Sequence, residues 1–200
     1  MSKGTFITLY GVNNIGKSTH AKLLVERLKQ AGHDAVYIKY PIYDLEYSGP
    51  KLNALLRSSN KQMVSEEELQ TLFRMNRKDY EPTLKKYFKA GKIVVAEDYT
   101  GTGIAWGMAK GLSQDFMEEL NKNLVREDFS ILLTGKRDIR VQEATHIHEQ
   151  NDELLEKVSK IFIQLGEKYG WRRIELQPKI EDTAELIWKN VADWLEIHLR

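Results

Sequence analysis

The stretch GVNNIGKS at residues 11–18 matches the phosphate-binding pattern G-x-x-x-x-G-K-[ST]. Residues 5–10 before it form a short apolar run with high strand propensity. Residues 19–31 after it carry apolar side chains at helical spacing, and Gly32 closes that run. This order of strand, loop and helix is the context in which the pattern binds a nucleoside triphosphate. We therefore expect a phosphate-binding loop at residues 11–18.

The residue types of this loop suit ATP and Mg²⁺. Gly11 and Gly16 let the backbone turn tightly enough to aim N–H groups at phosphate oxygens, and the dipole of the following helix adds positive charge. Lys17 is placed to reach the β- and γ-phosphates, and Ser18 to bring its hydroxyl to Mg²⁺. The predicted donor-binding residues are Gly11, Asn13, Asn14, Ile15, Gly16, Lys17, Ser18 and Thr19.

Composition narrows the class of protein. The chain has 200 residues, 42% hydrophobic and 30% charged, which predicts one globular domain over residues 1–200. The 30 Lys and Arg residues nearly balance the 29 Asp and Glu residues, so no overall basic field favours nucleic acid as a partner. Cysteine is absent, which excludes disulfides and cysteine-based metal sites. No signal-peptide pattern and no apolar run of about 18 residues is found, so we expect a cytoplasmic location without a membrane partner.

Four further apolar runs follow the first, at residues 35–40, 93–96, 130–133 and 173–176. They alternate with helical patterns, which is typical of α/β proteins, and runs without internal alternation are typical of parallel strands buried on both faces. The sequence thus predicts a five-stranded parallel sheet flanked by helices on both faces, with ligands at the carboxyl ends of the strands. Glu97 and Asp98 directly follow one of these runs and belong to that edge.

The segments between these runs predict two helices and a loop. A short helix follows Gly49-Pro50 at residues 51–57, and a long helix begins at Ser65, where Glu68 completes a capping box. Pro82 should kink or divide the long helix. Residues 134–151 are polar and charged with weak periodicity, so we expect a mobile lid at about residues 135–151.

Several segments, in the same order, resemble the thymidylate kinase family of nucleoside monophosphate kinases, which has the P-loop NTPase fold. They are the loop at 11–18, the aromatic-proline step Tyr40-Pro41, the stretch LFRMNR at 72–77 and the stretch EDYTGTGIAW at 97–106. The basic segment that holds Arg137 and Arg140 occupies the position of the family's lid.

This resemblance implies an enzyme that transfers the γ-phosphoryl group of ATP to a pyrimidine deoxynucleotide, dTMP to dTDP, with Mg²⁺ and as a homodimer. It implies that Phe73 stacks on the pyrimidine ring and that Arg77, one helical turn away, bonds its carbonyl edge. The predicted acceptor residues are Pro41, Tyr43, Arg57, Phe73, Arg74, Arg77, Asp98, Tyr99 and Thr102. The transfer step is assigned to Lys17, Arg137, Arg140, Glu97 and Asp98, and the metal to Ser18, Glu97 and Asp98.

The chain departs from the family pattern where the acceptor should bind. Asp98 stands where the family has the arginine that grips the acceptor phosphate, and Tyr43 where a second such arginine is usual. Glu97 replaces an aspartate, and Asn13 replaces an acid of the loop. A carboxylate beside a dianionic phosphate is costly in a desolvated site unless a cation intervenes.

Another group must therefore compensate for the two missing arginines at the acceptor phosphate, or the acceptor differs. Arg57 or Arg74 would have to compensate at the acceptor phosphate. Asn14 carries no charge, so the chain resembles the family members whose catalytic arginines, here Arg137 and Arg140, lie in the lid.

Two alternatives stay open. A deoxynucleoside kinase has a neutral 5′-hydroxyl as its acceptor, and a carboxylate such as Asp98 can take the hydroxyl proton. A degenerate nucleotide-binding protein would bind ATP without turnover, although Lys17, Ser18 and the basic lid argue against it.

Overall fold

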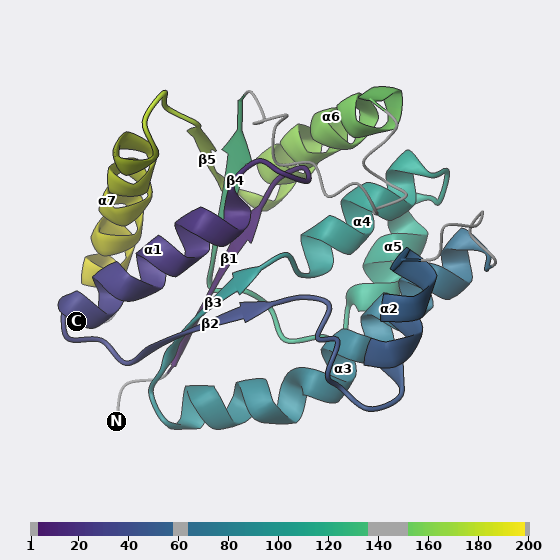
Figure 1. Cartoon of the computed structure of the whole chain (residues 1–200), viewed down its shortest axis with the longest axis horizontal. Coiled ribbons are helices and arrows are strands. Elements are labelled where there is room, and N and C mark those ends of the chain that lie inside the picture. The colour runs from purple at the N-terminus through teal and green to yellow at the C-terminus, as the bar shows by residue number, and fades with distance from the viewer. Residues whose placement is uncertain (1–3, 58–63, 136–151, 199–200) are drawn as a thin grey trace.

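The computed structural model describes residues 4–57, 64–135 and 152–198. Strands and helices alternate along these residues, except that two successive helices connect the second strand to the third and two connect the third to the fourth (Figure 1). The elements are β1 (Thr5–Tyr10), α1 (Lys17–Gln30), β2 (Ala35–Lys39), α2 (Ser48–Arg57), α3 (Glu66–Lys89), β3 (Ile93–Glu97), α4 (Thr100–Ala109), α5 (Gln114–Asn121), β4 (Phe129–Thr134), α6 (Asp152–Tyr169), β5 (Arg172–Glu175) and α7 (Ile180–His198).

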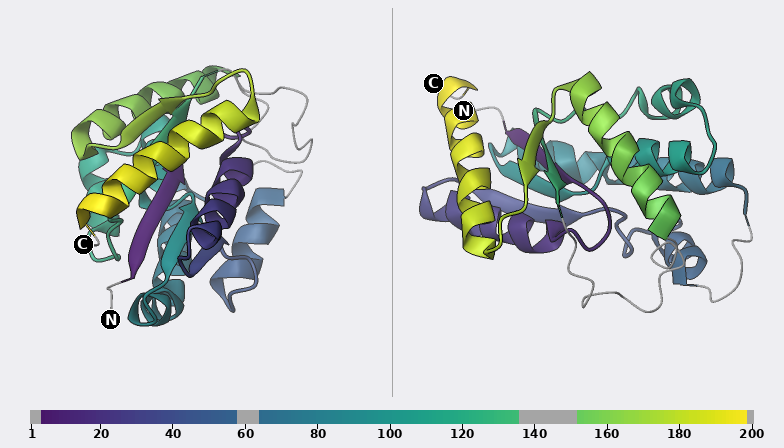
Figure 2. Two further views of the ribbon diagram at one scale, coloured as in Figure 1. Left: turned by 90° about the vertical axis from the view of Figure 1, so that its left-hand side faces the viewer. Right: turned by 90° about the horizontal axis from the view of Figure 1, so that it is seen from above.

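The five strands of the described residues form one sheet in the order β2-β3-β1-β4-β5, and every neighbouring pair is parallel. Helices cover both faces: α1 packs with α7 on one face, and α4 packs with α6 on the other (Figures 1 and 2). This confirms the predicted α/β architecture with a five-stranded parallel sheet. The prediction of one domain over residues 1–200 stays a prediction.

The central strands β1 and β3 are buried along their whole length, as their apolar sequences predict. In the register of the sheet, Glu97 pairs with Leu9 on β1 and with Lys39 on β2. These residues lie at the carboxyl ends of three adjacent strands. One edge of the sheet therefore gathers the phosphate-binding loop, a carboxylate and an ammonium group.

Most element boundaries lie within a residue or two of the prediction, but α2 does not. It begins at Ser48 and not at residue 51, so Gly49 and Pro50 form its first turn. Proline is well tolerated there, because the first N–H groups of a helix have no intrahelical partner. In α3, the capping box of Ser65 and Glu68 is confirmed. The helix continues through Pro82, so Pro82 does not divide it, and the predicted alternative of a kink stays a prediction.

The bond between Tyr40 and Pro41 is cis. The lid residues 136–151, with Arg137 and Arg140, lie outside the described residues, as do residues 58–63. Within the described ranges, no helix has the length and apolar character needed to cross a membrane.

Candidate functional site

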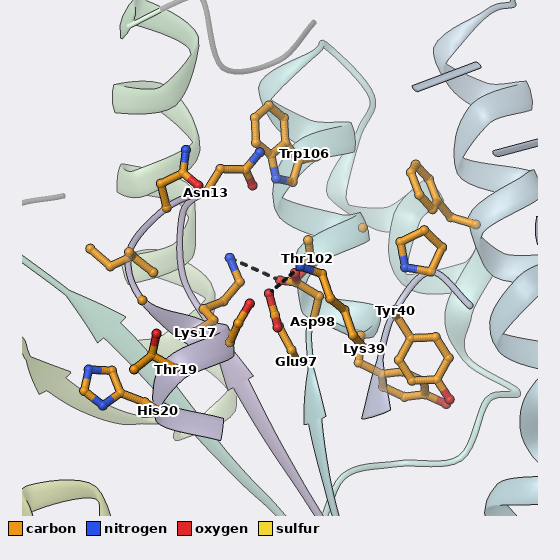
Figure 3. Close-up of a pocket in the computed structure, with 18 of the residues that line it drawn as sticks. Asn13, Lys17, Thr19, His20, Lys39, Tyr40, Glu97, Asp98, Thr102 and Trp106 are labelled. Atoms are coloured by element: carbon orange, nitrogen blue, oxygen red, sulfur yellow. Dashed lines mark hydrogen bonds and ion pairs between the residues drawn. The ribbon is translucent and has the colours of Figure 1, made fainter. Parts of the chain in front are cut away.

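A cleft of about 1050 Å³ lies at the carboxyl edge of the sheet (Figure 3). It extends from the phosphate-binding loop, over the ends of β2 and β3, to α2, α3 and α4. At the donor end it continues along the connection between β5 and α7. The loop, the acidic pair and the predicted base-binding residues thus share one continuous space.

The phosphate-binding loop owes its shape to three residues with positive φ. Gly11 has φ 143°, Asn14 has φ 61° and Gly16 has φ 92°. A Cβ atom on Gly11 would come within 2.8 Å of the Leu133 carbonyl oxygen, so glycine is required both by the conformation and by the close packing. α1 begins directly after Gly16, so its N-terminal N–H groups face the cleft.

The loop residues predicted to bind the donor line the cleft, with one exception. They are Asn13, Asn14, Ile15, Gly16, Lys17, Ser18 and Thr19, whereas Gly11 is not among the residues that line the cleft. Lys17 is buried, and its Nζ donates to the carbonyl oxygens of Gly11 (2.9 Å) and Val12 (3.0 Å). It also lies 3.7 Å from Asp98 Oδ1 (Figure 3). The ammonium group is therefore anchored between the loop and the acidic pair.

Glu97 and Asp98 form the floor between the two ends of the cleft. Glu97 Oε1 lies 3.1 Å from Lys39 Nζ, and Glu97 Oε2 accepts a hydrogen bond from the Tyr37 hydroxyl (2.6 Å). Asp98 Oδ1 accepts one from the Thr102 hydroxyl (2.7 Å). Asp98 itself has φ 62°, a left-handed conformation that asparagine and aspartate tolerate better than most residues.

The pKa values of the two carboxyl groups are shifted in opposite directions. Burial raises the pKa of Asp98, the negative charge of Glu97 adds to the increase, and Lys17 offsets it only in part. Burial also acts to raise the pKa of Glu97, but the positive charges of Lys17 and Lys39, together with hydrogen bonds from Tyr37 and Ser18, outweigh it and lower that pKa. Glu97 is thus the firmly ionised member, and Asp98 the one that takes up a proton more readily.

The predicted base-binding residues come together on the cleft side of α3. Phe73 and Arg77 both line the cleft, one helical turn apart. Arg77 is only 4% exposed, its Nη1 donates to Asn121 Oδ1 (3.1 Å), and burial lowers its pKa. Tyr99 and Thr102 line the same end. Arg77 is therefore a buried, oriented cation and not part of a solvated face.

Of the two arginines expected at the acceptor phosphate, one lines the cleft and the other does not. Arg57 lines the cleft beside Pro41 and Tyr43, with its guanidinium carbon 6.0 Å from the centre of the Tyr43 ring. Arg74 is partly buried and is not among the residues that line the cleft. Of the two arginines proposed to compensate, only Arg57 is thus placed at the cleft.

Sequence reasoning missed several cleft residues. Lys39 is the last residue of β2 and lines the cleft. Its position directly before Tyr40-Pro41 could have indicated this from the sequence. Gln70 precedes Phe73 by three residues, so helical periodicity alone would have placed it on the face of Phe73 and Arg77. Asn76 holds the segment after β2 against α3, because its side chain accepts from the Ile42 N–H (2.8 Å) and donates to the Ile42 carbonyl (2.8 Å). The remaining missed residues include Glu66, Lys110, Glu175, Gln177 and Thr183.

Comparison with known proteins identifies relatives that match most of this chain. The family model for thymidylate kinase matches residues 9–187. A probable thymidylate kinase of Thermococcus onnurineus is 31% identical over 181 residues, which cover 84% of this chain and 87% of the relative. The human thymidylate kinase is 28% identical over 188 residues, 92% of this chain and 87% of the human protein.

The fold is shared with a solved structure as well. The thymidylate kinase of Candida albicans superposes with a TM-score of 0.79 at 20% identity, over 98% of this chain and 93% of that one. Taken with the family match over residues 9–187, the comparisons show that the chain belongs to the thymidylate kinase family.

Proposed function

We propose that this protein transfers the γ-phosphoryl group of ATP to a pyrimidine deoxynucleoside monophosphate, dTMP to dTDP. The observation that carries the proposal is the continuous cleft, which joins the phosphate-binding loop to the pocket of Phe73 and Arg77. Family membership supports it, because the relatives include thymidylate kinases from archaea and from human.

ATP belongs at the loop end. The N-terminal amides of α1 and the ammonium group of Lys17 offer donors and positive charge to the phosphate oxygens. Asn14 Nδ2 is a buried donor without a partner among the described residues, and a phosphate oxygen would satisfy it. Lys17 would move its hydrogen bonds from the loop carbonyls to the β- and γ-phosphates.

The residues present also fit Mg²⁺, which prefers oxygen ligands. Ser18 lines the cleft, its hydroxyl acts to lower the pKa of the Glu97 carboxyl, and Asp98 lies next to Glu97 in the chain, so an alcohol oxygen and two carboxylates lie at the loop end of the cleft. Ser18, Glu97 and Asp98 would hold the ion directly or through waters. When bound, Mg²⁺ neutralises charge on the phosphates of ATP.

The acceptor belongs between α3 and α4. Phe73 would stack on the base, Arg77 would donate to its carbonyl edge, and Tyr99 and Thr102 would form the floor. Arg57 supplies positive charge at the acceptor phosphate, and Lys39, paired with Glu97, adds a second cation on that wall.

Catalysis would then consist of positioning and charge neutralisation. An oxygen of the acceptor phosphate forms the new bond to the γ-phosphorus, the bond from that phosphorus to the bridging oxygen of ATP breaks, and ADP leaves with that electron pair. Lys17 stabilises the charge that develops on the transferring group. Arg137 and Arg140 are assigned to the same task from the lid.

Asp98 favours a second candidate, a deoxynucleoside kinase. Asp98 occupies the sequence position at which the family has the arginine that grips the acceptor phosphate. Its carboxylate lies 3.7 Å from Lys17 Nζ. The raised pKa of Asp98, caused by burial, suits a group that accepts the proton of a 5′-hydroxyl.

A coupled assay of ADP release with ATP and Mg²⁺ tests both candidates, with dTMP and thymidine offered separately. We expect turnover with dTMP, and Asp98→Asn should lower kcat with dTMP by about 10-fold, because it removes one of the carboxylates placed to hold Mg²⁺. Asp115→Asn, an exposed site on α5, serves as the charge-matched control.

The outcomes are distinct. Turnover with thymidine alone, lost by about 100-fold or more in Asp98→Asn, would establish the nucleoside kinase. Absence of turnover with both acceptors would contradict the proposal and leave a nucleotide-binding protein.

On family membership alone, we further propose a homodimer. Light scattering of the full chain should give twice the mass of one chain, and a monomer at micromolar concentration would contradict this. The cytoplasmic location stays a prediction.

A further inference from the structure

Gln70 presents an unsatisfied hydrogen-bond acceptor to the cleft. It lies in the first turns of α3, is 2% exposed and belongs to the cleft lining. Its Nε2 donates to Glu66 Oε1 (2.8 Å), whereas its Oε1 is buried and has no partner among the described residues. An unsatisfied buried acceptor destabilises the fold, so its persistence points to a ligand that donates to it.

The orientation of this amide is fixed by an ion pair. Glu66 Oε2 lies 2.9 Å from Lys110 Nζ, and the two side chains are only 11% and 15% exposed. A carboxylate in an ion pair accepts hydrogen bonds and cannot donate them. Gln70 must therefore turn its NH₂ group toward Glu66, which leaves the carbonyl oxygen facing the cleft.

A donor lies next to this acceptor. Asn121 Nδ2 donates to the Met117 carbonyl (2.8 Å), which directs Asn121 Oδ1 toward Arg77 Nη1, while Arg77 Nε has no partner in the described part of the chain. A Cβ atom placed on Gly103 would lie 2.7 Å from Arg77 Nη2 and 3.2 Å from Gln70 Oε1. The guanidinium and the carboxamide oxygen thus converge on one point of the cleft wall.

A hydrogen-bond acceptor beside a donor, here Gln70 Oε1 and the Arg77 guanidinium, can distinguish pyrimidine bases by the hydrogen-bonding groups on their edge. Thymine and uracil present the N3–H donor next to the O4 acceptor, which matches Gln70 and Arg77. Cytosine presents the N3 acceptor next to the N4 amino donor, which is the reverse pattern and would leave both protein groups opposed by like groups.

We propose that Gln70 is a specificity-determining residue that accepts a hydrogen bond from the imide N–H of a thymine or uracil base, and that the Glu66–Lys110 pair holds it in that orientation. The inference rests on the proposed function, because it takes the pocket of Phe73 and Arg77 as the acceptor site. Glu66 is a positioning residue in this account.

Equilibrium binding to the full chain tests the inference without any need for turnover. Calorimetry with dTMP, dUMP and dCMP should show tighter binding of dTMP and dUMP than of dCMP. Gln70→Leu should weaken dTMP and dUMP binding by about 10-fold and spare dCMP, so the selectivity falls. Thr71→Ala, an exposed neighbour on the same helix, should leave the selectivity unchanged.

Glu66→Gln tests the orientation with little change in volume. The new amide at position 66 can donate to Gln70, so Gln70 is free to turn its NH₂ group toward the cleft, and the preference for dTMP over dCMP should fall by a similar factor. This variant also decides the matter if Gln70→Leu does not fold.

Three results would overturn the inference: wild-type preference for dCMP, wild-type selectivity in folded Gln70→Leu, or wild-type selectivity in Glu66→Gln. Failure of the proposed function is distinguishable, because a chain that binds dTMP selectively through Gln70 but transfers no phosphoryl group keeps this inference and loses only the reaction.

Discussion

Lys17 is the residue on which donor binding depends most. Its ammonium group is buried and anchored by two loop carbonyls, with Asp98 at 3.7 Å. We expect Lys17→Ala to lower kcat by about 1000-fold, because the transferring phosphoryl group loses a preorganised cation. Lys29→Ala, in the exposed last turn of α1, removes a lysine from the same helix and should keep full activity. Turnover of Lys17→Ala near the wild-type rate would contradict the donor site.

His20 makes stability depend on pH. Its side chain is 4% exposed, Nδ1 has no partner among the described residues, and burial lowers its pKa below the usual 6.5. In acid below about pH 6.5, the unfolded chain binds a proton that the folded protein does not, so the free energy of unfolding falls as pH falls, by at most about 1.4 kcal/mol per unit.

Urea unfolding at pH 7.5, 6.5 and 5.5 checks this prediction. The decline attributable to His20 should vanish in His20→Gln, so the difference between wild type and variant should change across this interval. A constant difference would show that His20 titrates alike in the folded and unfolded chain.

Single residues differ in how well the sequence predicts them. The loop residues form a contiguous pattern whose chemistry is fixed by type and spacing, so Lys17 and Ser18 could be placed without coordinates. The orientation of Gln70 depends on Glu66 and on the ion pair that Glu66 forms with Lys110 on another helix. No local sequence pattern predicts the ion pair between Glu66 and Lys110. For Arg74 the sequence predicts too much: its charge and its position in α3 suggest a role at the acceptor phosphate, but it is not among the residues that line the cleft.

At the scale of elements, two glycines of α4 face neighbours of different stiffness. A Cβ atom on Gly101 would meet the Trp171 ring at 2.5 Å and the Tyr10 ring at 2.9 Å. One on Gly107 would meet the Met117 sulfur at 2.6 Å. The stacked aromatic rings, with centroids 4.3 Å apart, cannot yield, whereas a methionine side chain can change rotamer.

We therefore expect Gly101→Ala to destabilise the protein by about 1–3 kcal/mol through overpacking. Gly107→Ala should cost less than about 1 kcal/mol, because the gain in helix propensity offsets the movement of Met117. Denaturant unfolding of both variants measures the difference. Equal losses would show that α4 shifts as a rigid body to absorb either methyl group.

Elements follow from sequence where the pattern is strong and local. Apolar runs located the five strands, and Ser65 with Glu68 located the start of α3. The sequence predicts a start of α2 that is too late, because Gly49-Pro50 is typical of a turn that precedes a helix. A tertiary contact explains the difference: a Cβ atom on Gly49 would lie 2.2 Å from the Tyr43 carbonyl oxygen, so this glycine packs the first turn against the preceding segment.

For the whole molecule, the dimensions of the cleft carry a prediction about both substrates together. Ligand sites commonly occupy about 300–1,000 Å³, and this cleft reaches about 1050 Å³ in one continuous space. A compound that joins adenosine to thymidine through a chain of phosphates should therefore bind more tightly than either nucleotide alone, because the second half binds as an intramolecular ligand.

The number of phosphates that gives the tightest binding shows whether the acceptor is a nucleotide or a nucleoside. An acceptor that carries its own phosphate needs one phosphate more in the linker than a nucleoside does, and affinity peaks where linker and span match. Calorimetry on linkers of four and five phosphates should favour five by about 10-fold or more if dTMP is the substrate. A preference for four would place the 5′-oxygen of thymidine beside Asp98 and assign the chain to the nucleoside kinases, whatever its family pattern implies.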